Sequence, residues 1–291
     1  MSIGILITNY NTWSMTSEAI QHCFTYAGTD SIHVTVVDDA STEVFNNQFG
    51  ESIRLIRQEK NQGLIKSLNL GLTSINTELI CIFDSDAWPL EPFTEGVKDY
   101  FKNNPSVGIA AFKTEDIHGF PNASFEAEPG IMSLVLGQKL YQYYQKVFLS
   151  KPKAITVYTC AMVIRKQVLE EIGLFDENFD WLELDHDICM RAIRKGWGIG
   201  ILPLRAFHKG SGTPQKVSHR VVRFYKNRWY LLSKFNKVKS PVIAKQLILA
   251  RIQSERMMLS TFGKLLFKNK DVWDDKIQGR KDLIQVIKNF K

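Results

Sequence analysis

Two carboxylates one residue apart follow a short apolar run, and they are the side chains of this chain best placed to do chemistry. The run 79–83 is apolar at every position and leads directly into Asp84, Ser85 and Asp86. A short apolar run bounded by polar residues is typical of a buried strand. Carboxylate oxygens suit Mg²⁺ or Mn²⁺, and such an ion in turn suits a diphosphate. The pattern therefore predicts a metal site that handles phosphate, with helix capping as the alternative.

A second acidic segment lies at 174–187, where seven of fourteen side chains are ionisable. Its pattern places Asp185 at or near the start of a predicted helix. The helix dipole favours a charged carboxylate there, and a charged carboxylate can accept a proton from a substrate. Helix capping by Asp185 or Asp187 is the structural alternative.

His208 is a third candidate. It follows a predicted strand and Pro203, and it precedes Gly210, Ser211 and Gly212. The backbone N–H groups of such a segment can surround an anion. A single histidine is more often structural than a metal ligand, so the residues alone leave both roles open.

These candidates need elements that bring them together, and strands alternate with helices over the first part of the chain. The predicted strands cover 3–8, 33–37, 53–57, 79–83 and 107–112, and the predicted helices cover 13–27, 64–73 and about 89–102. This alternation is typical of a doubly wound, mostly parallel sheet. Parallel strands end at one edge, so 8–11, 38–39 and 84–86 should meet where open α/β folds bind ligands.

The pattern is less regular over 113–153. Beyond it we expect a strand at 155–164, helices at 165–172 and 185–195, and a strand at 198–202. From residue 216 to the end the sequence predicts helices in which apolar and basic side chains are mixed. Pro241 is expected to separate two of these helices.

Charge is distributed unevenly along the 291 residues, whose net charge is +7. Residues 205–291 hold 21 Lys or Arg against 5 Asp or Glu, a net charge of +16, and the rest of the chain carries −9. Such a basic region is expected to face an anionic partner, either nucleic acid or anionic lipid. A solvated helical surface is the simpler alternative.

The remaining composition, 44% hydrophobic, is that of an ordinary globular protein. No apolar run reaches the roughly 20 residues that cross a bilayer, and the apolar start of the chain is too short for a signal peptide. The four cysteines show no CxxC pattern and no zinc-ligand spacing, so we expect free thiols in a reducing compartment. They are Cys23, Cys81, Cys160 and Cys189.

In their order and spacing, these motifs resemble family 2 glycosyltransferases with the GT-A fold, in the branch of bacterial rhamnosyl- and galactosyltransferases. The resemblance covers about residues 2–234. The matching positions are Asn9-Tyr10-Asn11, Val37-Asp38-Asp39-Ala40-Ser41, Asn61 and Gly63 with Asn69 and Gly71, Asp84-Ser85-Asp86, Gly173-Leu174-Phe175-Asp176-Glu177, Asp185 and Asp187 with Arg191, His208, and Asn227-Arg228. Leu184 stands where the family has Glu, and Glu183 is a neighbouring carboxylate that can supply the charge.

The resemblance implies an α/β fold of the GT-A (nucleotide-diphospho-sugar transferase) type. Its central sheet would be mostly parallel and flanked by helices, with a helical C-terminal extension. We accordingly expect a GT-A catalytic domain over 1–215 and a basic helical C-terminal region over 216–291.

The resemblance also implies a role for each candidate residue. Asp185 is implied as the catalytic base, and Asp187 or Glu183 can share that role. Asp86 and His208 are implied as ligands of Mn²⁺ or Mg²⁺. The implied donor-binding residues are Thr8, Tyr10, Asn11, Asp38, Lys66, Asp84 and Ser85, and the implied acceptor-binding residues are Trp181 and Cys160.

The implied activity is an inverting, metal-dependent transfer of a sugar from a UDP- or dTDP-sugar. The acceptor would be a hydroxyl group of a glycan or lipid-linked molecule in surface polysaccharide synthesis. We expect a cytoplasmic enzyme, placed at the inner face of the plasma membrane if the basic helices contact lipid. The same helices can support a homodimer.

The main alternative is a non-catalytic protein that binds nucleic acid or a membrane through its basic helices. Lys and Arg are interleaved with aromatic side chains over 219–230, a mixture that suits phosphate contacts and base stacking. The order of the motifs favours the transferase, for which no nucleic-acid partner is expected. A nucleotidyltransferase would need a glycine-rich basic loop after the first strand, and residues 9–12 do not form one.

Overall fold

The computed structural model describes residues 1–29, 32–148, 155–210, 217–266 and 270–290. The chain forms two compact units, the first from 1–128 with 154–212 and the second from 129–153 with 213–291. The second unit thus includes 129–153, which the expected boundary after residue 215 assigns to the first domain. The domain limits 1–215 and 216–291 stay a prediction.

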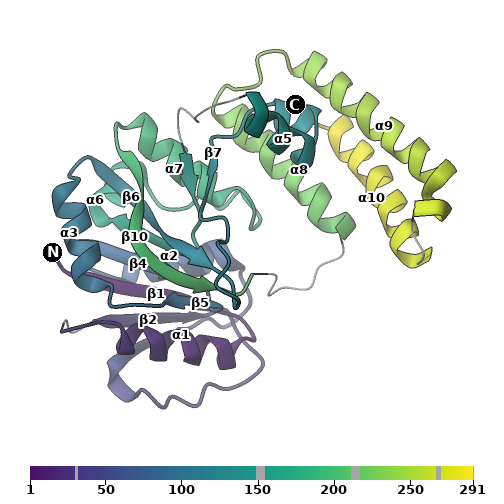
Figure 1. The fold of residues 1–291 in the computed structure, drawn as a ribbon. Coiled ribbons are helices and arrows are strands. Elements are labelled where there is room, and N and C mark those ends of the chain that lie inside the picture. Colours follow the sequence, from purple (N-terminus) through teal and green to yellow (C-terminus); the bar gives the residue numbers. More distant parts are fainter. Residues whose placement is uncertain (30–31, 149–154, 211–216, 267–269, 291) are drawn as a thin grey trace. The chain divides into compact units, whose positions relative to one another are not determined.

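In the described residues, an eight-stranded sheet is the centre of the first unit (Figure 1). Its order is β3 (Ile53–Arg57), β2 (His33–Asp38), β1 (Ile3–Asn9), β4 (Leu79–Phe83), β9 (Ala161–Arg165), β6 (Val107–Glu115), β10 (Gly198–His208) and β5 (Ala87–Pro89). The strands from β3 to β4 are parallel, as are β6 and β10, whereas β9 and β5 are antiparallel to their neighbours. The predicted central sheet is confirmed, and β1, β2 and β4 end at the same edge.

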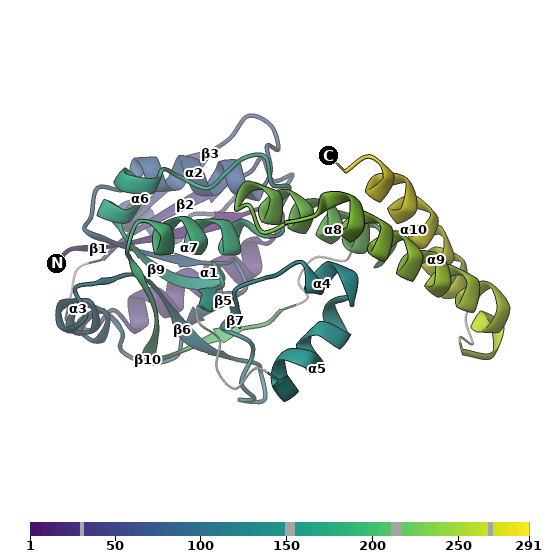
Figure 2. The same ribbon diagram turned by 90° about the horizontal axis from the view of Figure 1, so that it is seen from above.

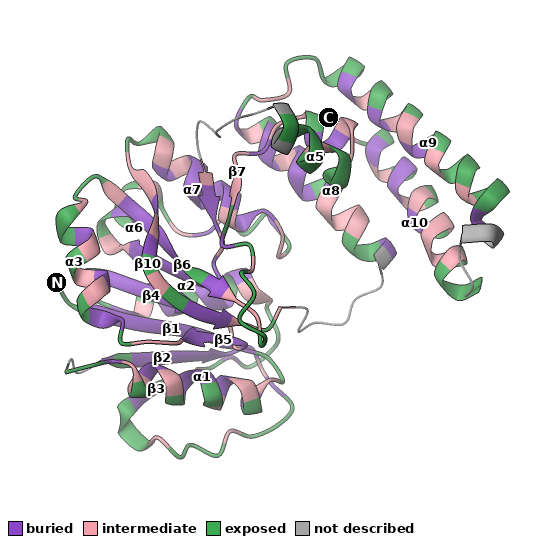
Figure 3. Cartoon of the chain, in the orientation of Figure 1, coloured by how far each residue is buried: buried purple, intermediate pink, exposed green. Residues whose placement is uncertain are grey.

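Helices cover both faces of this sheet, which explains why its central strands are apolar on both sides. The helices α1 (Trp13–Thr25) and α3 (Thr94–Asn103) pack on one face, and α2 (Leu64–Ser74), α6 (Lys166–Ile172) and α7 (Leu184–Arg194) lie on the other (Figure 2). Every residue of β1 and β4 is buried, as the purple strands in Figure 3 show. The polar side chains of β1, Thr8 and Asn9, are also buried and lie where the strand ends.

The single strand predicted at 155–164 is wrong, because the structure has two short strands there. Ile155–Val157 (β8) pairs with Phe125–Ala127 (β7) in a separate two-stranded sheet, and β9 joins the main sheet. Tyr158 and Thr159 interrupt the apolar run and allow the chain to change sheets. The three residues of β7 are too few to show the alternation of apolar and polar side chains that predicts a strand.

The strand predicted at 198–202 is too short, because β10 continues to His208. Its pairing with β6 shifts register between Ile201 and Arg205, a bulge that accommodates Pro203 within the strand. The extension matters for the site, since it carries the strand as far as His208.

The second unit consists of helices, which confirms the predicted C-terminal extension. They are α4 (Met132–Val135), α5 (Gln138–Phe148), α8 (Val217–Lys234), α9 (Pro241–Leu266) and α10 (Lys270–Lys288). Pro241 begins α9, as expected for a residue that separates two helices. Apolar side chains from α4, α8, α9 and α10 form a core of their own, which includes Tyr225, Trp229 and Ile248.

None of the helices in the described ranges has the long apolar stretch that a membrane span requires. The four cysteines are buried and free, as predicted from their spacing.

Gly71 lies where α2 packs closest to β1. A Cβ atom on residue 71 would collide with the side chain of Leu6, which is fully buried. We predict that Gly71→Ala lowers the free energy of unfolding by about 1–3 kcal/mol, the usual cost of overpacking, although alanine favours a helix. Chemical denaturation measures this change. Thr73→Ala, on the exposed side of the same helix, is the control and should stay within about 0.5 kcal/mol of the wild type. Equal stability of the Gly71 variant would mean that α2 can move away from the sheet at no cost.

Candidate active site

Asp84, Asp86 and His208 come together where β4 and β10 end. One carboxylate oxygen of each aspartate and one ring nitrogen of the histidine all lie within 4.8 Å of one another. Nε2 of His208 is 3.8 Å from Oδ1 of Asp86. Carboxylate oxygens and an imidazole nitrogen suit Mn²⁺ or Mg²⁺, so the residues present fit a divalent ion.

The short strand β5 explains how Asp86 and His208 meet. Ala87 lies opposite His208 in the antiparallel pairing of β5 with β10, and the N–H of Lys209 donates to the carbonyl oxygen of Asp86 (3.1 Å). The N–H of Ala87 donates to the carbonyl oxygen of Asp84 (3.0 Å), which closes a tight turn between β4 and β5. The sequence did not reveal β5, because three residues that include a proline show no strand pattern.

Asp185 lies in the first turn of α7, and the loop between β8 and β9 holds its carboxylate. The N–H of Thr159 donates to Oδ1 of Asp185 (2.8 Å). In the next residue, the carbonyl oxygen of Cys160 accepts from the N–H of Asp84 (3.1 Å). The same loop therefore connects the predicted base to the predicted metal site, and this connection depends on the break that the single-strand prediction missed.

Burial and mutual repulsion disfavour the charged forms of these carboxyl groups. Burial, together with the nearby charges of Asp86 and Asp185, raises the pKa of Asp84 to about 7. Burial also raises the pKa of Asp185, although hydrogen bonds from Thr159 oppose the shift. A divalent cation beside Asp84 and Asp86 would offset this repulsion.

The pKa of His208 shifts in the opposite direction. Burial lowers the pKa of its imidazole, and the charge of Asp86 only partly opposes this shift. The neutral imidazole, which is the form that binds metals, is therefore favoured at neutral pH.

The ends of β1 and β2 form the other half of the edge. The side-chain Nδ2 of Asn9 donates to Oδ1 of Asp38 (2.8 Å) and to Oγ of Ser41 (2.9 Å). The N–H of Asn11 also donates to Oγ of Ser41 (2.8 Å), and Asn11 has a left-handed backbone with φ of 55°. These bonds join the two loops and leave Tyr10 49% exposed at the edge.

The other predicted donor-binding residues differ in their accessibility. Thr8 is buried at the end of β1, Ser85 is half-buried, and Lys66 is exposed in the first turn of α2. Asp38 is fully buried and lies 3.6 Å from Nη1 of Arg57. Within the described residues, no hydrogen bond or ion pair connects Lys66 to the group at the end of β4.

The approach to α7 contains two non-glycine residues in left-handed conformations, Trp181 (φ 105°) and Glu183 (φ 74°). Such conformations persist only where their surroundings enforce them. The imidazole of His186 lies between two carboxylates, with Nδ1 3.7 Å from Oε2 of Glu183 and Nε2 3.4 Å from Oε1 of Glu126. This buried group positions the start of α7 and with it Asp185. The sequence offered no sign of Glu126, because β7 is so short.

The two alternatives to Asp185 as a base are engaged elsewhere. Asp187 is fully buried and forms a 2.8 Å ion pair with Nε of Arg191, which itself donates to the carbonyl oxygens of residues 172–174. Glu183 faces His186, as described above. The geometry therefore favours Asp185 among the three.

The predicted acceptor-binding residues are Trp181, which is half-buried, and Cys160, which is buried. Burial raises the pKa of the Cys160 thiol, and the carboxylates of Asp84 and Asp185 raise it further, so the thiol stays protonated. Two members of the glycine-rich segment after His208, at positions 211 and 212, lie outside the described residues.

The model of the family "Glycosyl transferase family 2" matches residues 4–173, which is more than half of the chain. The chain belongs to this family. The glycosyltransferase is similar to dTDP-rhamnosyl transferase RfbF of Shigella flexneri, with 23% identity over 257 residues that cover 82% of this chain and 83% of the relative.

Solved structures show the same fold. The enzyme is similar to S. aureus TarS 1–349 in complex with UDP-GlcNAc, with a TM-score of 0.57 and 17% identity over 99% of this chain and 82% of that one. It is also similar to the mannosyltransferase PcManGT from Pyrobaculum calidifontis in complex with GDP-Man and Mn²⁺, with a TM-score of 0.55 and 15% identity over 98% and 85% of the two chains. The fold is GT-A, as predicted, and the non-catalytic alternative does not account for this chain.

One family motif has a clear structural basis. Asn69 on α2 donates from Nδ2 to the carbonyl oxygen of Phe175 (2.9 Å) and accepts at Oδ1 from the N–H of Phe175 (3.0 Å). The motif asparagine and the 173–177 segment of this glycosyltransferase therefore bind each other.

Asp39 is the residue whose role the sequence did not reveal. Its buried carboxylate accepts from the N–H groups of Gln62 (2.7 Å) and Gly63 (2.8 Å) and from Nε2 of Gln58 (2.8 Å). It thereby holds the segment before α2 against the end of β2. The neighbouring motif residues Asn61 and Gly63 were the available signal.

Asp39→Ala would leave these donors without their acceptor. We predict a loss of about 1–3 kcal/mol in the free energy of unfolding, measured by chemical denaturation. Glu59→Ala, an exposed carboxylate in the same segment, is the matched control and should have little effect. Unchanged stability combined with weaker nucleotide binding would show instead that Asp39 acts on the ligand.

Proposed function

We propose that this glycosyltransferase transfers a sugar from a UDP- or dTDP-sugar to an acceptor hydroxyl, with inversion at the anomeric carbon and with Mn²⁺ or Mg²⁺. The observation that carries the proposal is the grouping of Asp84, Asp86 and His208 beside Asp185 at one sheet edge. The names of the Shigella relative and of the fold neighbours support a nucleotide-sugar donor.

Asp86 and His208, with Asp84 beside them, would hold the divalent ion, which supplies positive charge for the departing nucleoside diphosphate. Asp84 would also contact the ribose. We propose these assignments because the three side chains converge and because their own charges need a partner.

The other donor contacts lie along the ends of β1, β2 and β4. Tyr10 is exposed enough to stack on the base, with Thr8 and Asn11 beside it. Asp38 would accept from the imide N–H of the base, and Lys66 and Ser85 would contact the phosphates and the sugar. Each of these roles is part of the proposal.

Asp185 would perform the proton transfer. Its carboxylate accepts the proton of the acceptor hydroxyl while that oxygen bonds to the anomeric carbon, and the bond from this carbon to the diphosphate breaks with its electron pair on the diphosphate. A single displacement inverts the anomeric centre. The raised pKa makes Asp185 a stronger base than an ordinary aspartate, and Thr159 keeps its carboxylate oriented.

On the acceptor side, we propose that Trp181 packs against a sugar ring and that Cys160 lines the site. The acceptor would be a glycan or lipid-linked molecule in surface polysaccharide synthesis. We further propose that the basic helices after residue 216 contact the anionic inner face of the plasma membrane.

Loss of the base should abolish turnover without loss of donor binding. We predict that Asp185→Asn lowers kcat by about 10²–10⁴-fold while the Kd for the nucleoside diphosphate is unchanged. The assay measures nucleoside diphosphate release with a panel of nucleotide-sugars and glycan or lipid-linked acceptors. Asp180→Asn, exposed in the segment before α7, is the control. Full activity of the Asp185 variant would refute the assigned base.

Removal of metal ligands should act on nucleotide binding itself. We predict that calorimetry detects tighter UDP or dTDP binding with Mn²⁺ than with EDTA, and that Asp86→Asn and His208→Ala lose this difference. His33→Ala, exposed at the start of β2, is the control. Binding that is equally strong in EDTA would overturn the metal assignment.

A further inference from the structure

The second unit carries most of the positive charge of the chain. Its residues, 129–153 and 213–291, include 23 Lys or Arg and 5 Asp or Glu, a net charge of +18, and the first unit therefore carries −11. The imbalance is larger than the boundary at residue 205 suggested, because 129–153 adds four lysines and no acid, whereas only Arg205 and Lys209 pass to the first unit. A unit of this charge attracts anionic surfaces and repels a second copy of itself.

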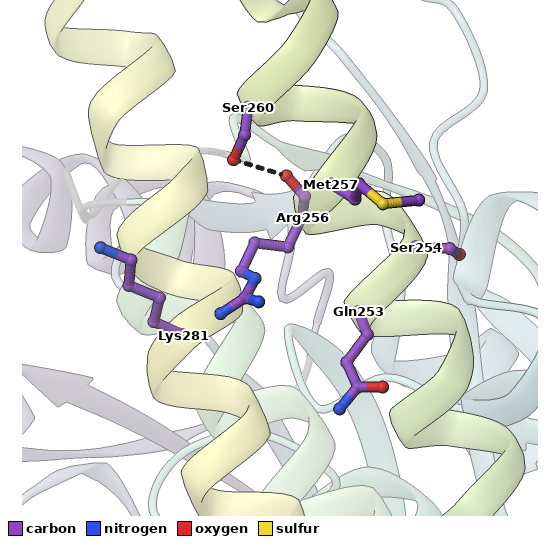
Figure 4. Close-up of a pocket in the computed structure, with 6 residues that line it drawn as sticks. All are labelled: Gln253, Ser254, Arg256, Met257, Ser260 and Lys281. Atoms are coloured by element: carbon purple, nitrogen blue, oxygen red, sulfur yellow. Dashed lines mark hydrogen bonds between the residues drawn. The ribbon is translucent and has the colours of Figure 1, made fainter.

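A groove of about 600 Å³ lies between α9 and α10 of this unit (Figure 4). It is lined by Gln253, Ser254, Arg256, Met257, Ser260 and Lys281, and we call these residues the cationic groove. Its lining holds two cations and no carboxylate. Arg256 extends from α9 toward α10, where Lys281 lies, and Oγ of Ser260 donates to the carbonyl oxygen of Arg256 (2.9 Å).

Two carboxylates adjoin residues of the cationic groove in sequence, and both are engaged; one is Asp282, which accepts from Nε2 of Gln278 (2.7 Å). Glu255, the one acid of α9, forms ion pairs with Arg251 and, at 3.3 Å, with Nε of Arg280. Arg256 and Lys281 form no ion pair within the described residues, and both are exposed. Their charges are available to an external anion.

An exposed apolar stripe runs along α9 and meets the cationic groove at Met257. It consists of Ile243, Leu247, Ala250, Met257 and Met258, whose spacing places them on one side of the helix. The four larger side chains are each more than half exposed. The opposite side of α9 supplies Ala244, Ile248 and Ile252 to the core, so core packing does not explain the stripe.

The two helices that form the cationic groove, α9 and α10, pack closely against each other. Nε1 of Trp273 donates to the carbonyl oxygen of Leu259 (2.7 Å), and the ring packs against Gly263, where a Cβ would collide with it. The groove and the stripe are therefore parts of a preformed surface on two joined helices.

We propose that the cationic groove and the apolar stripe together bind an anionic phospholipid bilayer. Arg256 and Lys281 contact headgroup phosphates, and Leu247, Met257 and Met258 enter the interface beside them. The net charge of +18 favours this occupant over a second copy. Exposed aliphatic side chains favour it over nucleic acid, whose backbone and base edges are polar. The inference deepens the proposed membrane contact and rests on it.

Cosedimentation of the full chain with vesicles tests the inference. Wild-type protein should bind vesicles that contain phosphatidylglycerol and not vesicles of phosphatidylcholine alone, and salt should weaken the binding. Arg256→Glu combined with Lys281→Glu should weaken binding by at least about tenfold, since each basic residue near such a surface contributes roughly 1 kcal/mol. Lys102→Glu combined with Lys195→Glu, two exposed lysines of the first unit, is the charge-matched control and should bind as the wild type does.

A second variant tests the apolar part. Leu247→Ser combined with Met258→Ser should also weaken vesicle binding, with an unchanged circular dichroism spectrum. Equal binding of both vesicle types, or wild-type binding by the Arg256 and Lys281 variant, would overturn the inference. The inference would also be overturned if these variants changed from dimer to monomer in light scattering while vesicle binding stayed intact. Loss of oligonucleotide binding alone in these variants would overturn it as well.

Turnover separates this inference from the proposed function. The groove variant should release nucleoside diphosphate from the donor at the wild-type rate, because Arg256 and Lys281 lie outside the proposed catalytic residues. Absence of turnover in every variant and in the wild type, with anionic vesicles still bound, would refute the transferase mechanism and leave the membrane surface intact.

Discussion

The burial of neighbouring carboxylates at the end of β4 is the constraint on which the site depends. Burial raises the pKa of Asp84 to about 7, and the nearby charges of Asp86 and Asp185 add to the shift. A protein keeps such a cluster only when other interactions hold it in place or when a cation completes it. Here the backbone N–H of Thr159 binds the carboxylate of Asp185, and the carbonyl oxygen of Cys160 binds the N–H of Asp84. The arrangement brings the proposed base and the proposed metal site to one edge of the sheet.

The sheet topology makes this convergence possible. The parallel strands β1, β2 and β4 end at one edge, and the antiparallel β9 begins at that edge, so the loop before β9 lies beside Asp84. The bulge in β10 and its pairing with β5 then bring His208 against the turn that follows Asp84. Residues far apart in the chain therefore meet without long loops.

The sequence predicted the strands and helices that have a strong local pattern of apolar residues. The apolar run before Asp84 predicted β4, and the alternation of elements predicted which strand ends share an edge. It missed β5, β7 and the break at Tyr158, because three-residue strands with mixed side chains carry no periodic signal. For the same reason Glu126 and its contact with His186 could not be anticipated. The role of Asp39 was also hidden, since a carboxylate that accepts from main-chain N–H groups has no partner that side-chain spacing can indicate.

Asp39 holds the segment before α2 largely through main-chain N–H groups of that segment. It accepts from the main-chain N–H groups of Gln62 and Gly63, whereas the side chain of Gln62 contributes a separate hydrogen bond from Nε2 to Oε1 of Gln58 (3.2 Å). Any residue with an N–H group preserves the bond at position 62, and proline alone removes it. Gly63, with φ of 92°, lacks this freedom. A substitution of Gln62 by another residue with an N–H group therefore keeps the main-chain bond to Asp39 and removes the side-chain bond to Gln58.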